Sequence, residues 1–390
     1  MAKSSVKFAG TILILSRIVY AANWYNLSPA ITRIEATFGI PLPATVYVFT
    51  FFLIGAGVFQ VPAGIISSRI GAKTTAFLGI LVMGISDLVA PFSFNYYMLL
   101  ALRAANGVGA ALFFSTAMAV LSQLYHEKVT EIVTLYNAAF NVGGGIGIIG
   151  FAFIVSSYSW QADELIMGVI TIVFAILILI AVPESEKYTS MSVPDITTRI
   201  RNRSTWAIAI AFSGFWAASY LLPEYLKNYS ISIGFSPFAS AVLGATILLI
   251  GVLGIQFVRA FRLRNLIRSA SYMTVLVGAF IVAVPYLGYI GTWSATVILG
   301  ILFVVVSSLE YSAVIAREKT LRYRALSLGL FNSIQISIGS LISVVFSYTL
   351  IYGYTLSFGI LGILVLLLLP VVILSVSRVQ RQTSGAVYDT

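Results

Sequence analysis

The chain has 390 residues, of which 59% are hydrophobic and only 9% are charged. Soluble domains carry about 25% charged residues, so this composition excludes a soluble globular protein and indicates a chain that crosses a membrane many times. With no cysteine and a single histidine, the chain has neither a disulfide framework nor a thiolate or multi-histidine metal site.

Twelve segments are apolar enough for membrane-spanning helices, each of which needs about 20 such residues. They are residues 9–31, 43–66, 74–91, 95–122, 131–157, 163–182, 205–226, 236–258, 268–288, 292–316, 325–350 and 353–377. We therefore predict an all-α membrane protein with twelve transmembrane helices and with the lipid bilayer as its surroundings.

The basic residues follow this arrangement of spans. If the N-terminus is cytoplasmic, 19 of the 23 Lys and Arg residues fall in cytoplasmic segments. Only Arg33 and Lys227 fall in loops on the outer side, and the remaining two, Arg17 and Arg103, fall inside spans. Such an asymmetry is typical of multi-pass proteins of the cell membrane, and it predicts that both termini are cytoplasmic. The net charge of +10 is then explained by the cytoplasmic rims, and we expect no nucleic acid as a partner.

A polar stretch, residues 183–204, separates the first six spans from the last six. We predict an N-terminal bundle (1–182), a central cytoplasmic linker (183–204), a C-terminal bundle (205–377) and a cytoplasmic tail (378–390). The halves also show weak internal symmetry, because amide side chains recur at corresponding places in the fifth and eleventh spans. Two pseudo-symmetric halves are typical of secondary transporters.

The fifth span contains a run that spells the dinucleotide-binding pattern G-x-G-x-x-G, with Gly145, Gly147 and Gly150, and with Asp163 downstream. That pattern needs a short strand before it and a soluble helix after it. Here it lies within one apolar stretch, so we expect no nucleotide and no cofactor. We predict instead that Gly143 and Gly147 let a second helix approach closely.

The segment 60–73, QVPAGIISSRIGAK, resembles the loop signature between the second and third helices of the major facilitator superfamily. The matching positions, which we expect to form a gating motif, are Gly64, Arg69, Gly71 and Lys73. Ser68 stands where the family usually has Asp, which puts the charge network of that gate in doubt. The fourth span carries LRAANGVGAA (102–111), which is similar to the family pattern R-x-x-x-G-x-G-A-A.

The first span contains NWYNLSPAI (23–31), which is similar to the D-R-x-N-L-S-x-A stretch of anion–cation symporters in the same superfamily. Asn23 and Trp24 replace the Asp-Arg pair, so Arg17, about two turns earlier, is the candidate for an anion-binding arginine. The resemblance implies two six-helix bundles that rock about a central site.

Polar and aromatic side chains inside the spans are candidates for the substrate cavity. They are Arg17, Asn23, Trp24, Asn26, Arg103, Asn106, Asn137, Asn141, Trp216, Tyr220, Asn332 and Gln335. The amides among them equally suit hydrogen bonding between helices, and the two residues of the seventh span equally suit packing. A purely structural role therefore stays open for these side chains.

Two carboxyl groups inside the predicted spans, Asp87 and Glu310, are candidates for carrying a proton. The alternative for each is a structural ion pair, Asp87 with Arg103 and Glu310 with Arg317. Both alternatives fit the spacing along the sequence.

We therefore predict a secondary transporter, and not an enzyme, that moves a small organic anion or another small metabolite by alternating access. Energy would come from a co-transported proton, because no nucleotide-binding motif is present. A multidrug/proton antiporter is the alternative within transporters. A membrane sensor would need a signalling domain, and a membrane-embedded enzyme would need a reactive set of residues. Neither is found in the sequence. We also expect the protein to be a monomer and to bind no metal.

Overall fold

The computed structural model describes residues 3–125, 129–184, 193–258, 265–317 and 321–372. Its first half consists of α1 (Lys3–Tyr25), η1 (Ser28–Ala30), α2 (Ile31–Phe38), η2 (Leu42–Thr45), α3 (Val46–Ile70), α4 (Ala72–Val89), η3 (Ala90–Phe92), α5 (Tyr96–Leu124), α6 (Val129–Ser157) and α7 (Trp160–Ala181). A short helix, α8 (Val193–Ile200), leads to the second half.

The second half consists of α9 (Arg203–Ser232), α10 (Pro237–Leu249), η5 (Ile250–Leu253), α11 (Gly254–Val258), α12 (Leu266–Ala283), η7 (Val284–Tyr286), α13 (Gly288–Arg317), α14 (Leu321–Thr349), η8 (Leu350–Tyr352) and α15 (Tyr354–Leu368). Among the described residues, twelve helical segments are long and apolar enough to cross a membrane, and none of these residues forms a strand. This result confirms the predicted all-α, twelve-helix fold.

Three details of the helices differ from the prediction. The first spanning segment continues through a 3-10 turn at Ser28–Ala30 as far as Phe38, and the eighth is interrupted by the 3-10 turn Ile250–Leu253. The linker contains α8, which is too short and too polar for a sequence pattern of spanning helices to reveal. The predicted tail, 378–390, lies outside the described residues.

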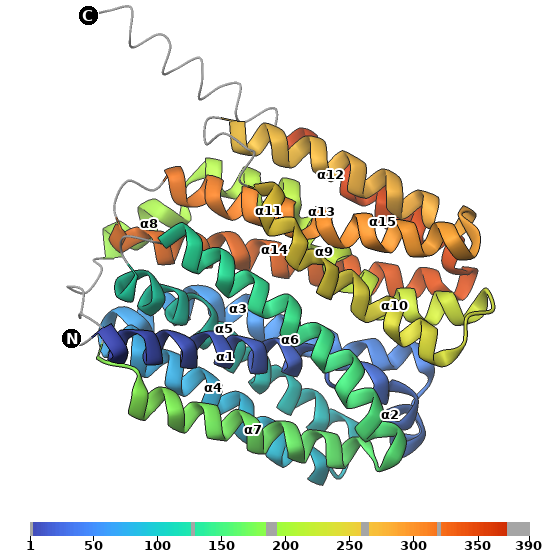
Figure 1. The fold of residues 1–390 in the computed structure, drawn as a ribbon, viewed down its shortest axis with the longest axis horizontal. Helices are drawn as coiled ribbons and strands as arrows, with labels where there is room; N and C mark the ends of the chain where they lie inside the picture. The colour runs from blue at the N-terminus through green and yellow to red at the C-terminus, as the bar shows by residue number, and fades with distance from the viewer. Residues whose placement is uncertain (1–2, 126–128, 185–192, 259–264, 318–320, 373–390) are drawn as a thin grey trace, which may run out of the picture.

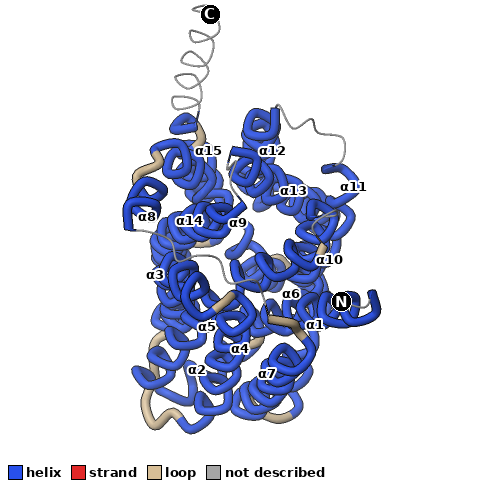
Figure 2. Tube along the Cα trace, turned by 90° about the vertical axis from the view of Figure 1, so that its left-hand side faces the viewer, coloured by secondary structure: helices blue, strands red, loops and turns tan. Residues whose placement is uncertain are grey.

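Helices α1 to α7 pack against one another, and so do α9 to α15. The two groups meet along two seams, one between α3 and α14 and the other between α6 and α10. In Figure 2, which looks along the helices, the two seams lie on opposite sides of the molecule. Figure 1 places the start of α1 and α8 at one end, which we call the α8 end, and α2 at the opposite end.

Small residues allow the helices within the first bundle to approach closely. Gly143 on α6 lies against the carbonyl oxygen of Ile18 on α1, and Gly147 lies against Ala22, so a side chain at either position would collide with α1. The glycine run is therefore part of an uninterrupted helix, and it packs as the sequence predicted. Gly145, on another face of α6, contacts Leu249 of α10.

The turn between α3 and α4 contains part of the predicted gating motif. Gly71 has φ +93°, a conformation that residues with a side chain rarely adopt, and it lets α3 end and α4 begin one residue later. The Nζ atom of Lys73 lies 3.2 Å from a carboxylate oxygen of Glu184, just beyond α7, while Arg69 is exposed. This ion pair connects the turn to the segment that follows α7.

Candidate functional site

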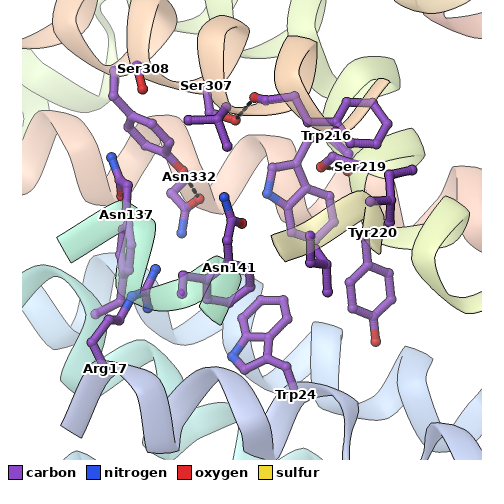
Figure 3. Close-up of a pocket in the computed structure, with 18 of the residues that line it drawn as sticks. Arg17, Trp24, Asn137, Asn141, Trp216, Ser219, Tyr220, Ser307, Ser308 and Asn332 are labelled. Atoms are coloured by element: carbon purple, nitrogen blue, oxygen red, sulfur yellow. Dashed lines mark hydrogen bonds between the residues drawn. The ribbon is translucent and has the colours of Figure 1, made fainter. Parts of the chain in front are cut away.

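A cavity lies between the two bundles and is lined by residues from both (Figure 3). Its volume is about 120 Å³. Its lining comprises Arg17, Tyr20, Trp24 and Tyr25 of α1, Phe114 of α5, Asn137, Phe140 and Asn141 of α6, Trp216, Ser219 and Tyr220 of α9, Ile247 and Leu248 of α10, seven residues of α13 that include Glu310, and Asn332 of α14. Mostly apolar walls with a few polar groups are typical of a small-molecule site.

The cation of the first-bundle wall is Arg17, which is only 4% exposed. Its guanidinium carbon lies 4.4 to 4.8 Å from the ring centres of Tyr20, Phe114, Tyr136 and Phe140. Such contacts stabilise a buried cation by the attraction between its charge and the ring faces. No acidic side chain of the described residues forms an ion pair with it, so its positive charge remains available to a ligand.

The second-bundle wall carries a carboxyl group, Glu310 of α13, which is 1% exposed. The side-chain nitrogen of Gln335 on α14 donates to its Oε2 atom at 2.9 Å, whereas Oε1 has no hydrogen-bond donor among the described residues. The hydroxyl of Tyr311 donates to Asn332 at 2.8 Å. Glu310 and Arg317 do not form the alternative ion pair: Glu310 is buried, whereas Arg317 is exposed.

Aromatic side chains connect the two bundles at the cavity. The rings of Trp216 and Tyr220 on α9 stack at 5.9 Å with an interplanar angle of 11°. Trp24 on α1 contacts both, at ring-centre distances of 6.4 and 5.8 Å. Aromatic pairs of this kind contribute about 0.5–1.5 kcal/mol beyond their buried area, so these three side chains both line the cavity and hold the bundles together.

Five of the twelve predicted cavity residues lie elsewhere. Gln335 lies behind the cavity, where it binds Glu310. Asn23, Asn26, Arg103 and Asn106 are buried inside the first bundle and do not line the cavity. Helical spacing placed them on spans correctly, but it did not determine which face of each helix turns toward the second bundle.

These four residues belong to a buried group that we call the acidic cluster. Its members are Asn23 of α1, Asn26 in the turn that follows α1, Asp87 of α4, Arg103 and Asn106 of α5, and Asp163 and Glu164 of α7. Asn23 and Asn106 each donate from their side-chain nitrogen to a different oxygen of Asp87. The alternative ion pair between Asp87 and Arg103 is not formed, and the two amide donors take its place.

Sequence reasoning missed Asp163 and Glu164 as site residues. Both lie in the first turns of α7, where acidic residues commonly favour a helix start, and both are 0% exposed. Asn26, just after the end of α1, donates to Glu164 Oε1 at 2.7 Å. Two adjacent acids at the start of a predicted span were the available signal, but their burial depends on how α7 packs against α1 and α4.

A model of the Major Facilitator Superfamily matches residues 13–335. The chain belongs to this superfamily. Membership confirms the predicted family, and because the superfamily consists of transporters, it also confirms that the chain is not an enzyme. Together with the twelve helices, it identifies an integral membrane protein.

Several curated members of the superfamily are similar over part of their length. The 4-hydroxybenzoate transporter PcaK of Pseudomonas aeruginosa is 28% identical over 163 residues, which cover 42% of this chain and 36% of that protein. The multidrug efflux protein YfmO of Bacillus subtilis is 34% identical over 133 residues, 34% of this chain and 33% of that one. The hexuronate transporter of B. subtilis is 23% identical over 199 residues, 45% and 47% of the two chains. The chain thus matches between a third and half of the length of these relatives.

A solved structure resembles the whole fold. The human organic anion transporter MFSD10 (TETRAN) has a TM-score of 0.74 and covers 94% of this chain and 99% of its own, at 12% sequence identity. At this identity the likeness shows the fold alone.

Proposed function

We propose that this protein transports a small organic anion by alternating access and that the central cavity is its substrate site. The observation that carries the proposal is Arg17, a cation buried at the cavity among aromatic rings with no acidic partner among the described residues. A buried charge without a partner is costly, and a carboxylate ligand would relieve that cost.

The cavity contains a group for each part of such a ligand. A carboxylate bound to Arg17 would leave the organic part against Trp24, Trp216 and Tyr220, which favours a flat or aromatic body. Asn137 and Asn332, which face the cavity from opposite bundles in Figure 3, would bind polar substituents. The names of the relatives, a 4-hydroxybenzoate transporter and a hexuronate transporter, agree with a carboxylate substrate.

Alternating access would use the two seams as its moving contacts. A ligand that touches α1 and α6 on one side and α9, α13 and α14 on the other would draw the bundles together around itself. Closure at one end of the seams and opening at the other would then expose the cavity to each side of the membrane in turn. Coupling to a proton would supply the energy, with Glu310 in the cavity wall and the carboxyl groups of the acidic cluster, Asp87 among them, as the candidate carriers.

Export of lipophilic drugs in exchange for protons is the second candidate function. It is favoured by the similarity to a multidrug efflux protein and by Glu310, whose carboxyl would attract a cationic drug. The two functions require opposite charges on the ligand. The sign of the charge that the purified protein binds therefore distinguishes them.

The test is binding and uptake of 4-hydroxybenzoate, with nicotinate, a hexuronate and a lipophilic cation as comparison ligands. We expect wild-type protein in proteoliposomes to take up 4-hydroxybenzoate when a pH gradient is imposed and to lose this uptake when the gradient is collapsed. Arg17→Gln should weaken binding about ten- to a hundredfold, as loss of a charge-assisted hydrogen bond predicts. Arg268→Gln, at an exposed arginine outside the cavity, is the matched control.

Two results would contradict the proposal. Binding of the anions that is unchanged in Arg17→Gln would remove Arg17 from the substrate site. Binding of the lipophilic cation, with no carboxylate bound, would favour the drug-export function.

A further inference from the structure

The acidic cluster lies inside the first bundle, separate from the residues that line the cavity. It contains three carboxyl groups, Asp87, Asp163 and Glu164, and one guanidinium group, Arg103. Asn23 and Asn106 bind Asp87, and Arg103 lies one turn before Asn106 on α5. Asn26, three residues after Asn23, binds Glu164, which follows Asp163 on α7. All four ionisable groups are at most 1% exposed.

The cluster is not neutral when every group is ionised, because three negative charges then face one positive charge. Burial of uncompensated charge is strongly unfavourable, so a neutral cluster needs two further positive charges. Among the described residues, no acidic side chain forms an ion pair with Arg103, and none of its three side-chain nitrogens makes a hydrogen bond. Arg103 instead lies 5.0 Å above the ring of Phe52.

The hydrogen bonds distinguish the three carboxyl groups. Asp87 accepts an amide N–H at each of its two oxygens, which suits an ionised group that only accepts. Glu164 accepts one hydrogen bond, at Oε1, and its Oε2 atom has no donor among the described residues. Asp163 has no donor at either oxygen within the same part of the chain.

Acceptors for carboxylic acid O–H groups are also present. The side-chain oxygens of Asn23, Asn26 and Asn106 are buried and have no hydrogen-bond partner among the described residues. A protonated Asp163 or Glu164 would donate to such an oxygen, and the acid would then be compatible with its surroundings. A metal ion is a weaker candidate, since the described residues contain no group of three acidic, histidine or cysteine side chains arranged to hold one.

We propose that Glu164 is the exchangeable proton-binding residue of this transporter, that Asp163 retains a proton, and that Asp87 stays ionised beside Arg103. The inference rests on proton-coupled transport as proposed above and names the residue that performs the coupling. A proton from water binds at Glu164 Oε2, and the same proton returns to water when the carboxylate forms again. The groups facing Glu164 are Asp163 on its own helix, Asp87 on α4, Arg103 on α5, and the amide of Asn26 just after α1.

The acidic cluster, where this proton binds, is linked to the cavity through neighbouring residues. Asn23 and Asn26, which donate to Asp87 and Glu164, flank Trp24 and Tyr25 at the end of α1, and these two aromatic residues line the cavity. The ring centre of Phe52 lies 4.7 Å from that of Trp24 and 5.0 Å from the guanidinium carbon of Arg103. A substrate that displaces Trp24 therefore shifts both the amide donors and the cation of the cluster.

The experiment is an infrared pH titration of the purified protein in lipid bilayers, following the C=O stretch of carboxylic acids. We expect the spectrum of wild type minus that of Glu164→Gln to contain one carboxylic acid C=O band whose intensity changes with pH. The spectrum of wild type minus that of Asp163→Asn should contain a C=O band that is present over the whole pH range of the titration, because Asp163 remains protonated. Glu310→Gln, in the cavity wall, should remove its own component and leave that of Glu164 unchanged. Glu164→Asp keeps a carboxyl group, and its titrating component should persist with an altered midpoint, which preserves the test if Glu164→Gln does not fold.

Two outcomes would overturn the proposal. One is a Glu164 component that does not change with pH. The other is a spectrum that responds to sodium at constant pH, because the cluster would then bind a metal cation.

Transport measurements separate this proposal from the proposed function. With 4-hydroxybenzoate as the probe, Glu164→Gln should retain exchange between labelled and unlabelled substrate but lose accumulation driven by a pH gradient by at least about tenfold. Accumulation at the wild-type level would overturn the role of Glu164. Failure of wild-type protein to transport the probe would count against the proposed substrate only, because the infrared titration requires no substrate.

Discussion

The hydroxyl of Ser333 on α14 donates a hydrogen bond of 2.7 Å to the backbone carbonyl of Gly57 on α3. This contact joins the two bundles near the middle of the α3–α14 seam. A Cβ atom at Gly57 would lie 3.5 Å from Cβ of Ile336. If the bundles rock against each other during transport, this seam must change.

A disulfide across the seam should therefore block transport. The distance of 3.5 Å lies at the short end of the range of Cβ separations in disulfides, so Gly57→Cys with Ile336→Cys should crosslink on oxidation. The chain has no native cysteine, so nothing else can react. We expect oxidation to reduce 4-hydroxybenzoate exchange at least about tenfold and a reductant to restore it. The two single variants are the controls, and full exchange by crosslinked protein would contradict rocking at this seam.

Substitution of Gly143 by alanine should destabilise the first bundle. The added methyl group would collide with the carbonyl oxygen of Ile18, and overpacking of this kind costs about 1–3 kcal/mol. On the same helix, Gly150→Ala places its methyl group 3.9 Å from the nearest atom outside the local backbone and is the matched control. Thermal unfolding in detergent should show a lower midpoint for Gly143→Ala than for Gly150→Ala, and equal midpoints would contradict the close α1–α6 packing.

The two glycines of the gating motif should respond differently to alanine. Gly71 has φ +93°, which disfavours any side chain, so Gly71→Ala should lose about 1–2 kcal/mol of stability. Gly64 lies within α3, and an added Cβ there would meet only Leu326 at an ordinary distance of 3.9 Å. Gly64→Ala should therefore be tolerated, as judged by thermal unfolding and by yield of monodisperse protein. A tolerated Gly71→Ala would show that the turn can take another conformation.

Loss of the ion pair at this turn should have a small effect. Glu184 is 71% exposed at its side chain, and exposed ion pairs contribute about 0–1 kcal/mol. Glu184→Gln should therefore leave the unfolding temperature almost unchanged in moderate salt. A large decrease would mean that this pair, rather than the packing of α3 and α4, holds the turn.

Cysteine labelling can test the predicted orientation of the protein in the membrane. Thr198 on α8 and Phe94 between η3 and α5 are exposed and lie toward opposite ends of the spanning helices. In intact cells, a membrane-impermeant maleimide should label Phe94→Cys, whereas Thr198→Cys should be labelled only after permeabilisation. The reverse pattern would contradict a cytoplasmic N-terminus.

The sequence by itself determined the number and order of the spanning helices. Burial of a helix in lipid depends on the local density of apolar residues, and that density is visible along the chain. The same reasoning identified the polar residues that a membrane helix does not carry without a cause, including Arg17, Asp87, Arg103 and Glu310.

Only the tertiary structure decided how these residues are grouped. Arg17 and Arg103 look alike in sequence, since each is a single cation within an apolar span, yet Arg17 lines the central cavity and Arg103 lies in the acidic cluster. In the sequence, Asp163 and Glu164 look like ordinary acidic residues at a helix start, and only the packing of α7 against α1 and α4 buries them. The physical reason is that a helix in a bilayer can satisfy its backbone in any rotation about its axis. Its rotation, and with it the partner of each polar side chain, is set by the close packing of small residues against neighbouring helices, such as Gly143 against Ile18.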